Sequence, residues 1–264
     1  MTVSTPTDLL EVSHVAVRFG GLVAIADMTF SVAPGKIVSL IGPNGAGKTT
    51  AFNVITGYLR PSAGRVLFKG RDLTQMSPPE IAELGVVRTF QRTSVFNACT
   101  VLESVVTALH LRGTTELLGA ILRRASVVAE EQRLHSEAEE LLDIAGLSHR
   151  ADAVAGTLAY GEQRLLALAM ALAAKPIMLL LDEPAAGLNP SETQKFMELI
   201  RNIRDRGVTV LLVEHDMHMV MSISDRIVVL NNGQMIAGGS PQEIQNNPEV
   251  IRAYLGEGLT NVKG

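Results

Sequence analysis

Apolar positions in the first part of the chain predict three β-strands and a helix. They alternate or run continuously from Leu9 to Val17 and from Leu22 to Val32, around Phe19-Gly20-Gly21, which is the pattern of two strands joined by a turn. Lys36 to Ile41 is apolar after its lysine except at Ser39. Such a run is typical of a parallel strand buried on both faces, because helices cover both faces of a parallel sheet. Thr49 to Thr56 can continue as a helix.

The rest of the chain alternates strand and helix signals, and one long stretch is helical. From Val101 to about Gly146 charged residues are interleaved with Leu and Ala. We expect residues 92–157 to form an inserted helical subdomain within a single domain of residues 1–264. Further strands are expected at Arg65–Lys69, Val86–Phe90, Ile177–Leu181, Val208–Val213 and Ile227–Leu230, and further helices after Ser77-Pro78-Pro79, from Leu165 to Ala174 and from Glu192 to Arg206.

These alternating elements predict an α/β fold. A mostly parallel sheet with helices on its faces forms the core, and the N-terminal strands add an antiparallel β subdomain. Asn232-Gly233 predicts a tight hairpin turn into Gln234 to Ala237. With 264 residues the chain is long enough to bury one sizeable core.

Composition narrows the classes of function. Charged residues make up 19% of the chain and the formal net charge is -4, so no strong basic field attracts nucleic acid. The single cysteine, Cys99, suits a reducing compartment. Met1 to His14 lacks the cationic and apolar parts of a signal peptide, and Lys175-Pro176 breaks the apolar stretch Leu165–Leu181 into pieces too short to span a bilayer. We therefore expect a cytoplasmic protein that reaches a membrane only through a partner.

One glycine-rich loop carries the clearest chemistry. Gly42-Pro43-Asn44-Gly45-Ala46-Gly47-Lys48-Thr49 has the P-loop spacing and stands between a predicted strand and a predicted helix. Its glycines let backbone N–H groups approach phosphates, and the helix N-terminus adds positive potential. Lys48 is expected to reach the β- and γ-phosphates and Thr49 to give its hydroxyl to Mg²⁺. We expect this loop, together with Thr50, to bind a nucleotide.

A pair of acids follows the apolar strand Ile177–Leu181. Asp182 and Glu183 come at the carboxyl end of this strand, the edge at which parallel sheets bind ligands. Adjacent carboxylates are costly there unless something cationic is near. We assign Asp182 as the acid on the Mg²⁺ side and Glu183 as the general base that polarises the water attacking the γ-phosphate.

Three other features have a structural interpretation beside a functional one. Leu158 to Gln163 is either an anion-binding helix N-terminus or a plain turn before the apolar helix. The acidic cluster from Ala129 to Glu140 has Glu and Arg at helical spacing, which indicates a solvated helix face rather than a cation site. His215 and His218 resemble half a zinc site, but no convergent Cys or His ligands accompany them.

With its motifs in this order, the sequence resembles the ATP-binding-cassette ATPases over essentially its whole length. Leu158-Ala159-Tyr160-Gly161-Glu162-Gln163 lies where that family has its signature, between the P-loop and the Asp-Glu strand. The resemblance implies that Phe19 stacks on adenine and that the signature residues from Ala159 to Glu162 contact nucleotide. It also implies that Gln91 is the Q-loop glutamine, with a catalytic and metal-side role, and that His215 is the switch histidine.

Within this family the chain is similar to the ATP-binding subunits of branched-chain amino-acid importers. The similar stretches are Leu158–Gly161, Thr100–Val105, Pro184–Pro190 and the tail Val250–Glu257. Ala159 departs from the wider family because it lacks the signature serine hydroxyl, so the backbone amides of Tyr160 and Gly161 are left to meet the γ-phosphate. Met170 stands where an arginine is usual.

The resemblance implies a transport motor with ATP and Mg²⁺ as cofactors. Two ATPase chains, identical or paralogous, would pair head to tail and hold each ATP between one chain's P-loop and the other chain's signature. Closure would drive transmembrane permease subunits, with Arg92, Thr93 and Phe96 near the groove that receives a permease helix. A periplasmic or extracellular substrate-binding protein would be an indirect partner. The chain would be held by the permease at the cytoplasmic side of the cell membrane.

Three alternatives stay open at this point. A related cassette could serve uptake of urea or short amides, or lipopolysaccharide export, because the ATPase does not touch the cargo. A soluble cassette of DNA repair or translation usually has paired cassettes, coiled coils or basic surfaces, none of which the sequence shows. A P-loop kinase would transfer phosphate to an acceptor other than water; Gln91, the signature and His215 argue against it.

Overall fold

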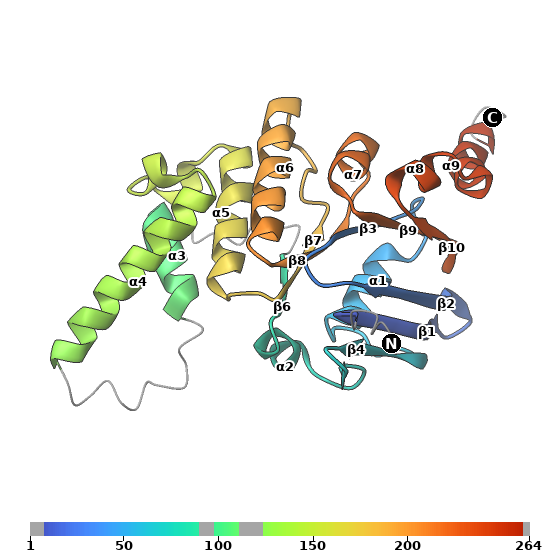
Figure 1. The fold of residues 1–264 in the computed structure, drawn as a ribbon, viewed down its shortest axis with the longest axis horizontal. Helices are drawn as coiled ribbons and strands as arrows, with labels where there is room; N and C mark the ends of the chain where they lie inside the picture. The colour runs from blue at the N-terminus through green and yellow to red at the C-terminus, as the bar shows by residue number, and fades with distance from the viewer. Residues whose placement is uncertain (1–7, 90–97, 111–123, 261–264) are drawn as a thin grey trace, which may run out of the picture. The chain divides into compact units, whose positions relative to one another are not determined.

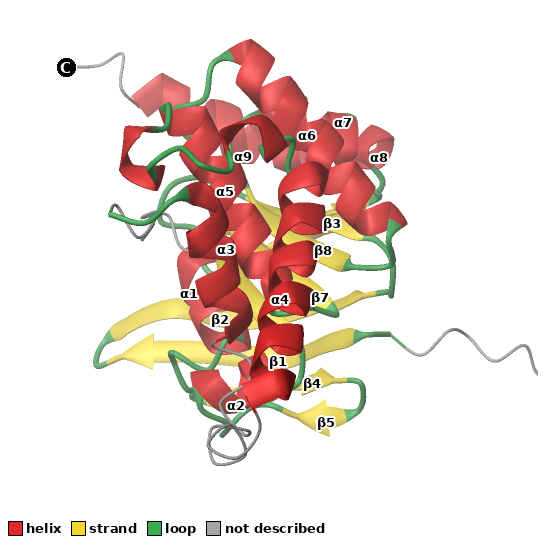
Figure 2. Cartoon of the chain, turned by 90° about the vertical axis from the view of Figure 1, so that its left-hand side faces the viewer, coloured by secondary structure: helices red, strands yellow, loops and turns green. Residues whose placement is uncertain are grey.

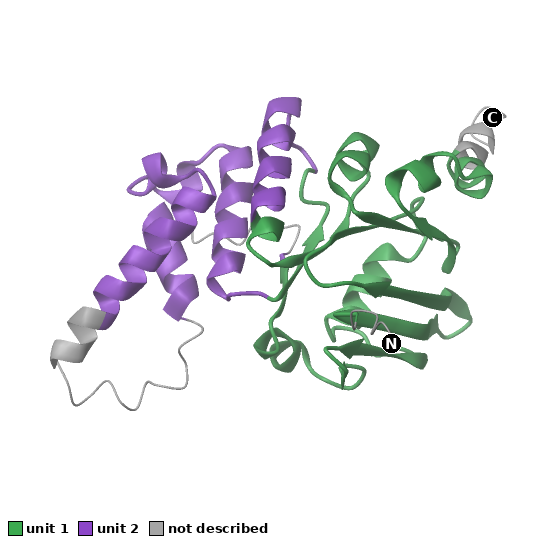
Figure 3. Cartoon of the chain, viewed as in Figure 1, with its two compact units in different colours: residues 1–88, 177–185, 203–264 green, residues 89–176, 186–202 purple. Residues whose placement is uncertain are grey.

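The computed structural model describes residues 8–89, 98–110 and 124–260 (Figure 1). Two compact units make up the chain, and Figure 3 colours them separately. Unit 1 comprises residues 1–88, 177–185 and 203–264, and unit 2 comprises residues 89–176 and 186–202. Among the described helices, none is both long and apolar enough to cross a bilayer.

Unit 1 is built on a mixed sheet whose central strands are parallel. The order of the described strands is β5-β4-β1-β2-β10-β9-β3-β8-β7-β6. β3 (Ile37–Ile41) pairs in parallel with β9 (Arg226–Asn231) and with β8 (Thr209–Val213), and β8 pairs in parallel with β7 (Met178–Asp182). Every residue of β3, β7 and β8 is buried, which explains why four of the five residues in each strand are apolar. The predicted α/β fold with a mostly parallel core is confirmed.

The N-terminal strands form the antiparallel part of the sheet, as their alternating sequence predicts. β1 (Leu10–Phe19) pairs antiparallel with β2 (Leu22–Val32) on one side and with β4 (Ala63–Phe68) on the other. β4 pairs in turn with the short edge strand β5 (Arg71–Asp72). At the opposite edge of the whole sheet lies β6 (Val86–Thr89).

A hairpin joins the two parts of the sheet. β10 (Gln234–Gly239) pairs antiparallel with β9 and touches β2 in parallel at Gln234 and Asp27. The turn before it is formed by Asn232 and Gly233, both with positive φ, at 47° and 72°. Two successive positive φ values are the geometry of the tight turn that the sequence predicts here.

Helices cover both faces of the parallel strands in unit 1. The described helices of this unit are α1 (Lys48–Ile55), α2 (Pro78–Glu83), α7 (Met217–Ile223), α8 (Pro241–Gln245) and α9 (Pro248–Thr260). β9 alternates between two cores: Val228 and Leu230 join the core that contains α1, and Ile227 and Val229 join the core that contains α7, α8 and α9. Figure 1 accordingly shows α1 on one side of β3 and β9, and α7 to α9 on the other.

Unit 2 is helical. α3 (Val101–His110), α4 (Arg124–Ile144) and α5 (Tyr160–Ala173) pack on one another, as Figure 2 shows. α6 (Pro190–Asp205) contributes its residues up to 202 to the unit. The helices expected within residues 92–157 fall in this unit, which also takes in 158–176 and 186–202.

The expected start of the signature helix at Leu165 was wrong. α5 begins five residues earlier, at Tyr160, with Ala159 at the N-cap. The carboxylate of Glu162 folds back to accept a hydrogen bond from the N–H of Ala159 at 3.1 Å, which satisfies a donor at the helix start. Tyr160, Gly161 and Glu162 therefore form the first turn of the helix rather than a loop before it.

Candidate functional site

Three chain segments leave the sheet of unit 1 at the carboxyl ends of its parallel strands. Val213, the last residue of β8, is in parallel register with Leu40 of β3 and with Asp182 of β7. The P-loop, Glu183 and the pair Glu214-His215 therefore follow the carboxyl ends of three neighbouring strands. This is the edge at which open α/β sheets bind their ligands.

The P-loop is held tightly against its surroundings. Gly47, with φ 103°, caps α1, and the N–H of Ala51 donates to its carbonyl oxygen at 2.9 Å. Gly42 has φ 153°, and a Cβ there would lie 2.0 Å from the carbonyl oxygen of Leu230. A side chain at either glycine is excluded, by backbone conformation at Gly47 and by close approach to β9 at Gly42.

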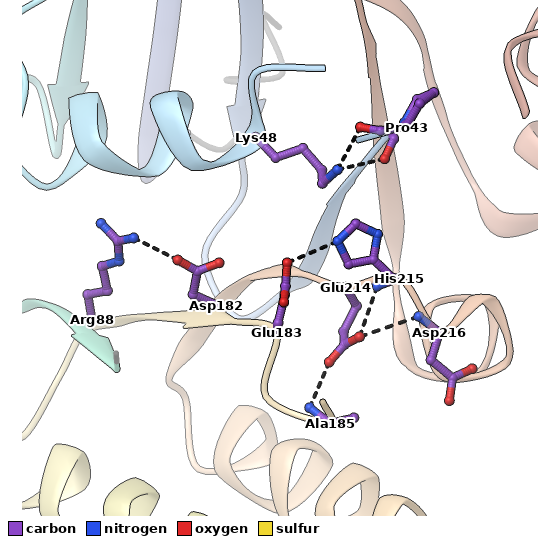
Figure 4. Close-up of polar contacts among 10 residues, drawn as sticks. Pro43, Lys48, Arg88, Asp182, Glu183, Ala185, Glu214, His215 and Asp216 are labelled. Atoms are coloured by element: carbon purple, nitrogen blue, oxygen red, sulfur yellow. Dashed lines mark hydrogen bonds and ion pairs between the residues drawn. The ribbon is translucent and has the colours of Figure 1, made fainter. Parts of the chain in front are cut away.

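Lys48 lies inside this loop. Its Nζ donates to the carbonyl oxygens of Gly42 at 2.6 Å and Pro43 at 2.9 Å, as Figure 4 shows. Lys48 itself is buried, whereas Asn44 and Thr49 are exposed. The ammonium group is thus placed in the loop before any ligand binds, and a phosphate oxygen would compete with the two carbonyls for its donors.

Asp182 is paired with a cation that the sequence did not identify. Its Oδ2 lies 2.6 Å from Nη2 of Arg88, and both side chains are only 8% exposed. Nη1 of Arg88 donates to Asn53 at 2.7 Å, and its guanidinium lies 5.6 Å from the centre of the Phe52 ring. In Figure 4 the other carboxylate oxygen of Asp182 points away from Arg88. Arg88 therefore offsets the burial of one of the two adjacent acids.

Glu183 contacts the histidine expected to work with it. Oε1 of Glu183 lies 2.9 Å from Nε2 of His215, and both side chains are partly exposed. Glu183 has φ 48°, in the left-handed region, and its N–H donates to the carbonyl oxygen of Val213 at 2.9 Å. The two residues expected to act in hydrolysis are thus hydrogen bonded to each other at the sheet edge.

Glu214 is a buried acid that the sequence did not single out. It is 3% exposed, and within the described part of the chain its two carboxylate oxygens accept from three backbone N–H groups: Ala185 at 2.7 Å, His215 at 2.9 Å and Asp216 at 3.4 Å. Burial raises the pKa of Glu214, and the three N–H donors oppose that rise. No signal in the sequence distinguishes it from an ordinary residue at a strand end.

Phe19 lies at the exposed end of the first hairpin. It closes β1, is 50% exposed, and has the exposed Leu22 and Val23 beside it at the start of β2. The next residue, Ala24, is in close contact with the P-loop, because a Cβ on Gly47 would meet its carbonyl oxygen at 2.9 Å. An exposed aromatic ring thus stands at the end of β1, in the hairpin whose second strand, β2, borders the phosphate loop.

The signature residues lie in unit 2, at the first turn of α5. Ala159 has no side-chain oxygen to cap this helix, so only the Glu162 half of a capping arrangement is present. Glu162 also accepts from Nε of Arg150 at 2.9 Å, and this arginine lowers the pKa of its carboxyl. Met170, which replaces the usual arginine, is half-buried on the same helix.

Tyr160 makes contacts that sequence reasoning missed. Its hydroxyl donates to the carbonyl oxygen of Ala186 at 3.2 Å and accepts from Nε of Arg164 at 3.1 Å. The guanidinium of Arg164 lies 5.0 Å from the centre of the Tyr160 ring. Tyr160 is 45% exposed, whereas Arg164 is buried. The tyrosine therefore connects the start of α5 to Ala186, in the stretch Pro184–Pro190 that resembles the importer ATPases.

Four of the expected functional residues lie outside the described part of the chain: Gln91, Arg92, Thr93 and Phe96. Among the residues that are described, no group of three or more His, Cys, Asp or Glu side chains is arranged to hold a metal ion. His218, considered for zinc together with His215, is exposed on α7.

Comparison with known proteins agrees with this geometry. The family model described as "ABC transporter" matches residues 25–186, which is more than half of the chain. The chain belongs to the ABC transporter family. A second model, described as "Branched-chain amino acid ATP-binding cassette transporter", matches residues 234–260.

Individual members of the ABC transporter family are similar over nearly the whole chain. The high-affinity branched-chain amino acid transport ATP-binding protein LivG of Escherichia coli (strain K12) is 46% identical, over 94% of this chain and 98% of its own. The corresponding protein BraF of Pseudomonas aeruginosa is 45% identical over the same shares. The ADP conformation of MJ1267, an ATP-binding cassette of an ABC transporter, superposes with a TM-score of 0.80 at 30% identity, covering 95% of this chain and 99% of that one.

Membership of the ABC transporter family confirms several expectations at once. The fold, the recognition as an ATP-binding cassette and the activity as an ATP-hydrolysing subunit are confirmed. As a transporter ATPase the chain has membrane permease partners. The roles of single residues at the site stay predictions. The structure adds Arg88 and Glu214 to the residues around the site in unit 1, and it adds the contacts of Tyr160 within unit 2.

Proposed function

We propose that this chain hydrolyses ATP to drive the import of branched-chain or related amino acids. The choice of cargo rests on the match at residues 234–260 and on the identity with LivG and BraF. The assignment of hydrolysis rests mainly on the hydrogen bond between Glu183 and His215. This bond lies at the carboxyl ends of the parallel strands, where the P-loop also begins. A site for binding alone has no need of a carboxylate and an imidazole in this arrangement.

The nucleotide would be held by its base and by its phosphates. Residues 42–50 wrap the phosphates with backbone N–H groups, and Lys48 exchanges its carbonyl partners for the β- and γ-phosphate oxygens. Phe19 offers its exposed ring to the adenine. This assignment is supported by the contact between β2 and the P-loop, which puts both binding surfaces in unit 1.

Thr49 and Asp182 fit the needs of Mg²⁺. Their hydroxyl and carboxylate are hard oxygen donors, which Mg²⁺ prefers to nitrogen or sulfur. The Thr49 side chain is exposed, and Asp182 retains a carboxylate oxygen that points away from Arg88. Gln91 is the third proposed contact. When bound, the ion neutralises charge on the phosphates.

Glu183 would act as the general base. It orients and deprotonates the water that attacks the γ-phosphorus; the bond from phosphorus to the leaving oxygen of ADP breaks, and the proton passes to the Glu183 carboxylate. His215 keeps that carboxylate in place through its 2.9 Å hydrogen bond and lies at the same edge to contact the γ-phosphate. Gln91 would join them in positioning the water.

A second ATPase chain would complete each site. The signature residues of one chain, Ala159 to Glu162, would meet the ATP held by the P-loop of the other. The N–H groups at the start of α5 are suited to the γ-phosphate, because helix N-termini attract anions. With Ala159 in the serine position, backbone amides provide this contact without a hydroxyl. The partner is an identical chain or a paralogue.

The remaining partners belong to the transporter. Permease subunits would be contacted through the segment after Gln91, at Arg92, Thr93 and Phe96, and this contact would keep the chain at the cytoplasmic side of the membrane. A substrate-binding protein outside the membrane would deliver the amino acid without touching this chain. No nucleic-acid partner is proposed, in keeping with the net charge of -4.

A comparison of E183Q with wild type tests the hydrolytic role. The expected result is unchanged ATP binding with phosphate release lowered by about 10²-fold or more, because general-base catalysis supplies about 10²–10⁴. E198Q is the matched control, since Glu198 is an exposed residue of α6 outside the site. Full phosphate release by E183Q would rule out the assigned role, and phosphate found on an organic acceptor would indicate a kinase instead.

A further inference from the structure

Glu214 stands between the two segments that carry the proposed catalytic pair. Its Oε1 accepts from the N–H of Ala185, two residues after Glu183, at 2.7 Å. Its Oε2 accepts from the N–H of His215 at 2.9 Å and from that of Asp216 at 3.4 Å. One buried carboxylate thus binds the backbone on both sides of the Glu183–His215 hydrogen bond, as Figure 4 shows.

We propose that Glu214 is a positioning residue for ATP hydrolysis, fastening the segment after β7 to the segment after β8 so that Glu183 and His215 stay within hydrogen-bond distance. The inference rests on the proposed roles of Glu183 and His215. Glu214 is assigned no contact with the nucleotide or the attacking water. It acts only through the backbone of the two segments that carry Glu183 and His215.

The backbone of Glu183 shows why a clamp is needed there. Its φ of 48° lies in the left-handed region, which a residue with a Cβ adopts only at an energetic cost. Such a conformation persists where surrounding contacts hold it. The N–H of Glu183 is held by the carbonyl oxygen of Val213, and two residues later the N–H of Ala185 is held by Glu214. Both acceptors, Val213 and Glu214, lie at the end of β8. They hold the backbone at Glu183 itself and two residues beyond it.

The chemistry of the contacts explains why the clamp is a carboxylate. All three partners of Glu214 are N–H donors, so both of its oxygens have to accept. A glutamine at this position would turn an NH₂ group toward one of the two segments, donor against donor. Burying a carboxylate is unfavourable unless it is hydrogen bonded, and an apolar residue would fill a buried strand end more cheaply. The presence of a charged group therefore points to its contacts rather than to packing.

E214Q and E214A in the full chain test the proposal, with E243Q as the matched control. Glu243 also accepts a backbone N–H, from Ser240 at 2.7 Å, but it caps the remote helix α8. We expect kcat for ATP hydrolysis to fall about 100-fold in E214A, since misplacing a reacting group by about 1 Å costs that much, while KM for ATP stays within about twofold. E214Q, which keeps one acceptor, is expected to lie between E214A and wild type. E243Q is expected to match wild type.

Hydrogen exchange supplies a second readout that needs no turnover. The amide protons of Ala185 and His215 are expected to exchange faster in E214Q than in wild type, while those of β3 and α1 are unchanged. A variant of a merely structural residue would raise exchange throughout the unit. If E214A does not fold, this measurement on E214Q decides the matter.

Several results would overturn the inference. An unchanged kcat in E214Q and E214A, a rise in KM that accounts for the whole loss, equal losses in E243Q, or unchanged exchange at Ala185 and His215 would each do so. E183Q measured in the same series separates the two claims. If E183Q loses activity and the Glu214 variants do not, only the positioning role fails; if E183Q is fully active, the proposed function fails.

Discussion

Replacing Arg88 by methionine removes the cation that offsets the burial of Asp182. The two side chains are 2.6 Å apart and only 8% exposed, so the Asp182 carboxylate would be left in a buried position without its partner. Breaking such a pair from one side costs about 3–5 kcal/mol. Asn53 also loses its 2.7 Å hydrogen bond from Arg88, which places the expected loss at the upper part of this range.

Urea unfolding followed by circular dichroism measures the effect. R88M is expected to unfold at a much lower urea concentration than wild type, with a free energy of unfolding smaller by about 4–5 kcal/mol. R88K is expected to fall between the two, because a lysine keeps the charge but cannot reach Asp182 and Asn53 at once. R133M is the control, since the ion pair of Arg133 with Glu130 is largely exposed and worth less than about 1 kcal/mol.

Two results would contradict this role of Arg88: a free energy of unfolding of R88M within about 1 kcal/mol of wild type, or a loss in R133M as large as that in R88M. The first result would mean that Asp182 is not a buried charge in need of a partner. The second would mean that the buried ion pair of Arg88 contributes no more to stability than the exposed ion pair of Arg133.

The remaining predictions concern three other contacts. A159S gives α5 a side-chain cap and is expected to stabilise the chain by about 1 kcal/mol; an unchanged thermal midpoint would contradict this. Y160F leaves the buried Arg164 without the Tyr160 hydroxyl, and we expect a loss of about 1.5–3 kcal/mol in urea unfolding, which an unaltered midpoint would exclude. Burial raises the pKa of Glu214, so the stability that its protonation contributes is present below the unfolded pKa and is lost as the pH rises through the folded pKa. Wild type should therefore gain stability over E214Q as the pH falls toward 4.5, and a gap that narrows instead would contradict the sign.

Elements whose signal lies in their own residues could be predicted from the sequence. β3, β7 and β8 are buried on both faces and are mostly apolar, and the turn at Asn232-Gly233 uses residues suited to positive φ. The start of α5 was misplaced because Ala159 lacks the side-chain oxygen by which a helix cap is recognised. α8 and α9 were missed, although Ser240 and Glu243 form a capping box at the start of α8.

Some residues of the site could likewise be predicted from the sequence, and others could not. The P-loop and the pair Asp182-Glu183 are contiguous motifs, so they could be identified before the fold was known. Arg88 is 94 residues from Asp182, and Glu214 is 29 residues from Ala185. Their contacts exist only because β6, β7 and β8 lie in one sheet. The need for a cation beside the two acids could be inferred from the sequence, but which residue supplies it could not.

Leucine uptake by vesicles that contain this chain with its permease, substrate-binding protein and ATP tests the central claim most directly. Wild type is expected to take up leucine only when ATP is present inside the vesicles. E183Q is expected to lose this uptake, while E198Q transports normally. Urea offered in place of leucine is not expected to accumulate. Full leucine uptake by E183Q would contradict the proposed mechanism, and accumulation of urea but not leucine would contradict the proposed cargo.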